Sequence, residues 1–266
     1  MYPWRRVLIP TDFSTAARWA FDNAIHIAGS TGAELAILHV RMTLVSRPDE
    51  LRFPAGGDLY DYAEEHELET LRQRARELNA SVSTRLLVRQ APDPGAEIHR
   101  VARDESADLI VIATHARHHV AHLLIGSTTL SVLSDPPAPV LAVRYGTPRR
   151  RQMRKLVVPV HPEQASMASA TLAGAIAAHE DGEVHLIVVC DGTSRESADA
   201  SASAVASRLT NVKHQQVLLE GENIEREIVR YAHRIDADAI LVHTTMSEVK
   251  RAIIRSAETP VMIVPC

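Results

Sequence analysis

Three segments of the chain place polar, chemistry-bearing side chains directly after apolar runs. Pro10-Thr11-Asp12 puts a carboxylate at the end of the first run, and His39-Val40 closes the second. After a later run, a polar loop reaches Gly126-Ser127-Thr128 before the next helical pattern. A Gly-Ser-Thr at a helix start offers free backbone N–H groups, hydroxyls and the positive end of the helix dipole, which together suit a phosphate group. The segments predict an anion site; the alternative is that their polar side chains are ordinary helix caps.

The segment His115–His122 carries four histidines within eight residues. His115 and His119 are four residues apart, as are His118 and His122, so a helical turn would place either pair on one face in a geometry that suits Zn²⁺. No Cys-x-x-Cys or His-Glu-x-x-His signature accompanies them. These four histidines are metal-ligand candidates, the alternative being a solvated loop, and we predict no resident metal.

A second set of candidate ligands falls at the ends of predicted strands in the second half of the chain, and its members are His161, Cys190 and His243. Imidazole and thiolate groups that meet could hold a soft metal. Hydrogen bonds to loop backbone explain the same residues more simply.

The chain lacks the pattern of an efficient hydrolase. Such an enzyme needs an activated nucleophile with its base, or a metal-bound water. Ser127 and Thr128 have only His115 as a candidate base, and no Gly-x-Ser-x-Gly elbow is present. We therefore predict a protein that is not an enzyme, leaving slow ATP hydrolysis or self-phosphorylation at Ser127 or Thr128 open.

The elements that must position these residues alternate between strand and helix. Expected strands are 7–10, 35–40, 82–88, 109–113 and 140–143. Runs that are apolar on both faces and separated by helices predict a parallel sheet covered on both sides, and right-handed crossovers make it a doubly wound α/β domain. Such sheets bind ligands beyond the carboxyl ends of the strands, where the strand order reverses.

The helical patterns carry their own predictions. In the first helix, Ala17, Phe21, Ala24 and Ala28 recur at helical spacing and should form its buried stripe. Gly29 and Gly32 should end this helix. The next should bury Leu68, Leu71, Ala75 and Leu78, another should span Glu97–Asp104, and the helix after Gly126 should use Leu130, Val132 and Leu133.

An internal repeat indicates that this unit occurs twice. Residues 107–112 reappear as 237–242, and residues 139–143 reappear as 260–264. Leu8-Ile9-Pro10 likewise matches Val157-Val158-Pro159, and Gly32 matches Gly182. We predict two α/β domains in tandem, residues 1–146 and 153–266, each with a five-stranded parallel sheet. The basic junction around Arg149, Arg150 and Arg151 is interpreted as a solvated linker, the alternative being a site that binds an anion.

Composition narrows the class of protein. The 266 residues are 45% hydrophobic and 23% charged, as in globular proteins, and the net charge of -4 argues against nucleic acid as a partner. No apolar run approaches the ~20 residues that span a bilayer, so we expect no membrane partner. We also expect no signal peptide, and two cysteines suit a reducing cytoplasm.

Taken together, Pro10-Thr11-Asp12-Phe13-Ser14, His39-Val40 and Gly126-Ser127 followed by Pro139-Val140 resemble the universal stress protein family, once per half of the chain. The resemblance implies a tandem, Rossmann-like fold of the adenine-nucleotide alpha-hydrolase type. It also implies ATP as the cofactor for the subset of the family with a Gly-x-x-Gly-(nine residues)-Gly-Ser/Thr motif. The cofactor-binding residues would then be Thr11, Asp12, Val40, Ala113, His115, Ala116, Gly126, Ser127 and Thr128.

The sequence departs from that motif at two positions. Ala113 and Ala116 stand where the motif has its leading glycines, although the spacing to Gly126 is intact. Alanine in a left-handed conformation costs roughly 1–2 kcal/mol. A Cβ that faces the phosphates would weaken binding further, because it displaces them from the backbone. The expectation is a weakened adenine-nucleotide site in the first half.

The second half departs further. His161 stands in place of Asp12, and the repeat offset falls from 130 to 121 residues, so nine residues are missing from the phosphate-loop region. We expect that half not to bind ATP.

The expected function is that of a cytoplasmic stress-response protein acting by binding and assembly. A metal- or small-ligand-responsive binder using the His115–His122 loop and a ligand-free structural adaptor are the alternatives. Self-association is expected through the last strand of each domain, 140–143 and 261–264, because an uncovered apolar edge invites pairing. The resemblance implies that these two strands pair with each other within the tandem, and association of two chains is left open.

Overall fold

The computed structural model describes residues 2–43, 57–114, 125–147, 152–160, 166–190, 195–244 and 247–265. In the first half these residues form β1(Arg6–Thr11), α1(Thr15–Thr31), β2(Glu34–Met42), α2(Gly57–Leu78), β3(Thr84–Ala91), α3(Pro94–Asp104), β4(Leu109–Ala113), α4(Ser127–Ser134) and β5(Val140–Val143). The second half repeats the order as β6(Lys155–Pro159), α5(Ser166–Glu180), β7(Glu183–Cys190), α6(Arg195–Ala206), β8(Lys213–Glu220), α7(Ile224–Arg234), β9(Ala239–His243), α8(Ser247–Ser256) and β10(Val261–Val264).

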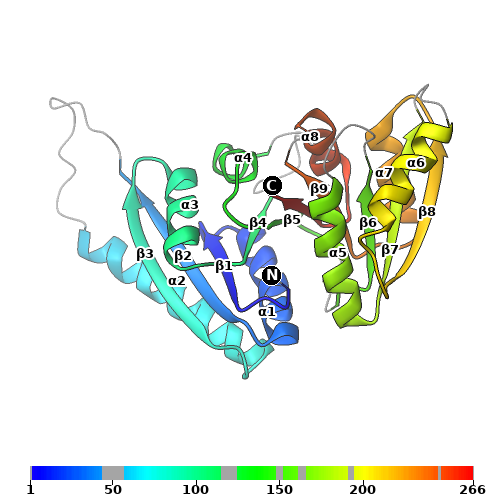
Figure 1. Ribbon diagram of the computed structural model, residues 1–266. Helices are drawn as coiled ribbons and strands as arrows, with labels where there is room; N and C mark the ends of the chain where they lie inside the picture. The colour runs from blue at the N-terminus through cyan, green and yellow to red at the C-terminus, as the bar shows by residue number, and fades with distance from the viewer. Residues whose placement is uncertain are drawn as a thin grey trace, which may run out of the picture.

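All these strands belong to one sheet, with the order β3-β2-β1-β4-β5-β10-β9-β6-β7-β8 (Figure 1). Within each half the strands pair in parallel. The halves join where β5 and β10 pair antiparallel, with Leu141 opposite Met262. The tandem doubly wound α/β fold is confirmed, and the expected pairing of the two last strands occurs within the chain.

Helices cover both faces of the sheet. One apolar cluster packs α1, α2, α5 and α6 against one face, and a second packs α3, α4, α7 and α8 against the other. Alternation along a strand divides its side chains between the clusters: Val7 and Ile9 belong to the first and Leu8 to the second. The continuous apolar runs of the sequence are therefore explained by burial on both faces.

Helix ends follow local chemistry. The Ser14 side chain accepts from the Ala17 N–H at the start of α1, and Asp93 and Asn223 cap α3 and α7 in the same way. Helix α1 continues through Gly29 and ends at Gly32, which adopts a left-handed conformation at φ 71°. The prediction that Gly29 ends this helix was wrong.

Several predicted boundaries also need correction. The strand expected at 82–88 lies at Thr84–Ala91, and α3 begins at Pro94 rather than at Glu97. Strands β1 and β2 extend to Thr11 and Met42. The helical stripes are buried except for two members, Leu78 and Leu130, which are 38% and 37% exposed.

The two halves repeat their supporting contacts. The Asp108 carboxylate accepts from the backbone N–H groups of Arg5 and Arg6, and Asp238 accepts from those of Arg154 and Lys155. Each carboxylate thereby fixes the start of its half's first strand.

One detail of the sequence alignment changes. The strand registers pair Arg6 with Glu34 and Lys155 with Glu183, so the counterpart of Gly32 is Asp181, not Gly182. Asp181 is itself left-handed, at φ 51°.

In the part of the chain that the structure describes, every helix is too short or too polar to cross a bilayer.

Candidate functional site

A cavity of about 290 Å³ lies at the carboxyl ends of β1, β2 and β4. It spans the place where the order of strands reverses, between β1 and β4, which is where doubly wound sheets bind ligands. Its polar wall consists of Thr11, Asp12, Ser14, Thr128 and Thr129. Its apolar wall consists of Pro10, Ala17, Leu38, Val40, Met42, Pro94, Ile98, Ile112 and Ala113.

Asp12 is presented by a tight turn after β1. The Thr11 hydroxyl accepts from the Phe13 N–H at 3.0 Å, and Asp12 Oδ1 accepts from the Ser14 N–H at 3.0 Å. Phe13 takes a left-handed conformation at φ 60° and stacks on His39, with ring centroids 4.5 Å apart. Because Ser14 provides the helix cap, Asp12 is not the cap of α1; its side chain is exposed beside the cavity.

His39 supports this turn from the neighbouring strand. Its Nδ1 donates to the Thr11 carbonyl at 2.8 Å, and its Nε2 lies 3.9 Å from the Glu64 carboxylate. Glu64 Oε2 also accepts from Arg41 Nε at 2.6 Å. His39 therefore holds the turn that carries Asp12 rather than lining the cavity itself.

The opposite wall is the first turn of α4. Thr129 Oγ1 donates to the Ala113 carbonyl at 3.1 Å and so fixes that turn to the end of β4. Gly126 is the N-cap and forms no side-chain cap hydrogen bond. Since the first N–H groups of a helix lack intrahelical partners, this turn is suited to an anion.

Two positions of the nucleotide motif, Ala113 and Gly126, lie among the described residues, and their backbone conformations are known. Ala113 ends an extended strand and is not among the described residues with positive φ, so the strain expected from a left-handed alanine is absent there. Gly126 has φ −61° and ψ 150°, and an added Cβ would meet nothing within 4 Å. Neither conformation nor packing requires glycine at position 126.

The sequence-predicted site residues divide into three groups. Those that line the cavity are Thr11, Asp12, Val40, Ala113 and Thr128. Gly126 and Ser127 start the same helix without lining the cavity, and His115 and Ala116 lie outside the described residues. The lining residues that were not predicted as site residues are Pro10, Ser14, Ala17, Leu38, Met42, Pro94, Ile98, Ile112 and Thr129. Of these, Pro10, Ser14 and Thr129 carried a signal, because they lie within or directly after the polar segments singled out in the sequence.

The universal stress protein family matches residues 3–144. The chain belongs to this family. A universal stress protein of Methanocaldococcus jannaschii is 28% identical over 143 residues, covering 53% of this chain and 82% of the relative. Universal stress protein A homolog 2 of Coxiella burnetii is 30% identical over 123 residues, covering 46% of this chain and 82% of the relative.

A solved structure reproduces the whole arrangement of this universal stress protein. The crystal structure of a universal stress protein from Archaeoglobus fulgidus superposes with a TM-score of 0.76, covering 98% of each chain at 18% identity. At that identity the similarity shows the fold, here across both halves of the chain.

Most of the predicted metal ligands lie outside the part of the chain that the structure describes. His115, His118, His119, His122 and His161 lie outside the described residues. Among the residues that are described, no three His, Cys, Asp or Glu side chains are grouped so that they could hold a metal ion.

The remaining two candidates of the second half occupy separate strands. Cys190 ends β7 and His243 ends β9, with β6 between them. His243 is buried, and burial, followed by the charge of Lys250, lowers the pKa of its imidazole.

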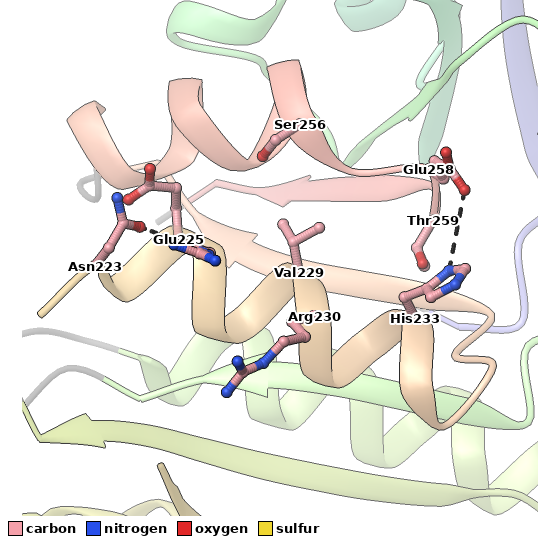
Figure 2. Close-up of a pocket in the computed structure, with 9 residues that line it drawn as sticks. Asn223, Glu225, Val229, Arg230, His233, Ser256, Glu258 and Thr259 are labelled. Atoms are coloured by element: carbon pink, nitrogen blue, oxygen red, sulfur yellow. Dashed lines mark hydrogen bonds and ion pairs between the residues drawn. The ribbon is translucent and has the colours of Figure 1, made fainter. Parts of the chain in front are cut away.

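A larger hollow of about 570 Å³ lies on the outer surface of the second half, between α7 and the segment before β10 (Figure 2). Its lining carries both charges, since it includes Arg226 and Arg230 as well as Glu225 and Glu258, and His233 Nδ1 lies 4.0 Å from the Glu258 carboxylate. Its lining comes from helices and a loop, away from the carboxyl ends of the strands, so we place the candidate site of this universal stress protein in the smaller cavity.

Proposed function

We propose that this universal stress protein binds an adenine nucleotide in the cavity of its first half. One observation carries the proposal: Asp12 and Thr128 line a single cavity at the point where the strand order reverses. The apolar wall formed by Leu38, Val40 and Ile112 suits a nucleobase. The carboxylate of Asp12 accepts hydrogen bonds from an amine or a hydroxyl, which adenosine supplies.

The phosphate end of the ligand is assigned to the first turn of α4. Thr128 contributes a hydroxyl there, and the free N–H groups of the turn contribute the positive end of the helix dipole. The volume of about 290 Å³ is at the small end for ligand pockets, which fits a nucleoside in the cavity with its phosphates at the rim.

The proposal assigns binding, not turnover, to this site. Among the described residues, the polar wall carries hydroxyls and one carboxylate, and His39, behind that wall, already donates to the Thr11 carbonyl. A hydrolase needs a base in reach of its nucleophile or water.

We further propose a cytoplasmic stress-response role and a division of the chain into domains 1–146 and 153–266.

Titration calorimetry of the full chain with ATP tests the proposal. We expect heat of binding with a Kd in the micromolar to millimolar range, and at least a tenfold loss for Asp12→Ala, about 1.4 kcal/mol. Asp199→Ala, on the outer helix α6, is the matched control and should bind like the wild type. Absence of heat at millimolar ATP would remove the nucleotide from the proposal, and stabilisation by Zn²⁺ instead would favour the metal-responsive alternative.

A further inference from the structure

The two ends of α4 contact different halves of the molecule. At its N-terminal end, Thr128 and Thr129 line the cavity. At its C-terminal end, the Leu133 carbonyl accepts from Lys250 Nζ at 3.3 Å. Lys250 belongs to α8, so a side chain of the second half reaches the helix that borders the cavity of the first.

Lys250 is a buried side chain that bridges two backbone carbonyls. Lys250 is only 5% exposed. Its Nζ also donates to the carbonyl of Thr244, the residue that follows β9, at 3.1 Å. Burial and the charge of Arg251 lower the pKa of this amine, while Asp135 raises it. An apolar side chain would fill the same space without burying a charge. What the ammonium adds is a directional link between β9 and α4.

The last turn of α4 is held from the first half as well. His99 Nε2 donates to the Val132 carbonyl at 3.0 Å, and α3, which carries His99, lines the cavity with Pro94 and Ile98. The last carbonyls of a helix have no intrahelical partners, and a cation there complements the negative end of the helix dipole. His99 and Lys250 thus fix one end of a helix whose other end faces the cavity.

We propose that Lys250 is a positioning residue, through which the second half fixes α4 and so sets the affinity of the first half's cavity for an anionic ligand. The inference rests on the proposed nucleotide site. Fixing the last turn fixes the direction of the helix axis and hence the N–H groups of the first turn. The second half, expected not to bind ATP, would in this way contribute to binding by the first.

Two measurements on the full chain test this role. Lys250→Met keeps the length of the side chain and removes its charge and donors; Lys213→Met, at a side chain 76% exposed on β8, is the matched control. We expect Lys250→Met to weaken ATP binding about threefold to tenfold. We also expect faster hydrogen exchange of the α4 amides in nucleotide-free protein. Lys250→Arg, which keeps charge and donors, should restore part of both.

The outcomes separate this inference from the proposed function. If the wild type binds ATP and Lys250→Met binds it equally well, the inference is wrong. If the wild type binds no ATP, the proposed function fails, and exchange in α4 alone decides: acceleration confined to α4 supports the positioning role, and unchanged exchange overturns it. Should Lys250→Met not fold, Lys250→Gln, which keeps a donor without the charge, takes its place under the same criteria.

Discussion

Replacing Gly126 separates the demands of the fold from the demands of a ligand. The folded chain accepts a Cβ at this position, because φ is −61° and the added atom would meet nothing within 4 Å. Alanine is nevertheless a poorer N-cap than glycine, so Gly126→Ala should lower the free energy of unfolding by only about 0.5–1 kcal/mol. A phosphate at the first turn of α4 would lie beside the new methyl group, and we expect ATP affinity to fall about tenfold, or 1.4 kcal/mol.

Gly126→Ser provides the matched comparison. Serine caps helices better than glycine, so this variant should be as stable as the wild type or more stable by a few tenths of a kcal/mol. Its hydroxyl accepts from the same N–H groups that a phosphate would use, and we therefore expect weaker ATP binding despite the added stability. Urea denaturation and calorimetry measure the two quantities separately. If affinity follows stability across wild type, Ala and Ser, the ligand does not approach this turn and the reasoning is refuted.

Ala113→Gly should strengthen ATP binding severalfold in calorimetry, because it removes a methyl from the cavity wall; unchanged affinity would show that the methyl does not face the ligand. His243 has a lowered pKa in the folded state, so the unfolded state binds the proton first, and stability should fall as pH drops below about 6.5, by at most about 1.4 kcal/mol per pH unit from this group. Urea titrations of His243→Gln should show a shallower fall, whereas parallel pH profiles would contradict this. Residues 1–146 and 153–266 produced separately should each dimerise in analytical ultracentrifugation, because β5 and β10 lose each other's cover; strictly monomeric halves would count against that pairing.

The sheet was predictable because burial on both faces leaves a simple mark in the sequence. Residues 109–113, 140–143 and 261–264 were placed correctly, since each run is short and wholly apolar. Val82 shows the limit of this signal: it is buried, yet it lies in the turn before β3. Hydropathy reports burial, and a buried loop residue reads like a strand residue.

The sequence predicted the site residues that lie next to the end of a strand or helix. It did not predict those that reach the site only through tertiary packing. Asp12 and Thr128 directly follow or begin an element, so the topology alone brings them to one edge of the sheet. Ile98 enters the cavity from the middle of α3, where it is indistinguishable in sequence from any other core position. Lys250 offered no signal at all, because a lysine within an amphipathic pattern is normally solvated and its partner, the Leu133 carbonyl, is 117 residues away.

The amino ends and the carboxyl ends of the strands have different roles in this sheet. This difference explains how the two halves could diverge in sequence. The contacts that Asp108 and Asp238 make lie at the amino ends of the first strands and recur in both halves. The nine-residue deletion in the second half falls after β9, beyond the carboxyl ends, and leaves those contacts untouched. The shorter connection between β9 and α8 therefore leaves the supporting contacts of the second half's first strand in place. It also brings α8 close behind β9, so that Lys250 on α8 reaches both the Thr244 and Leu133 carbonyls. The second half thus has a shorter connection after β9 and, in addition, a hydrogen bond from Lys250 to α4 of the first half. Helix α4 is therefore the element through which the second half would act on the cavity.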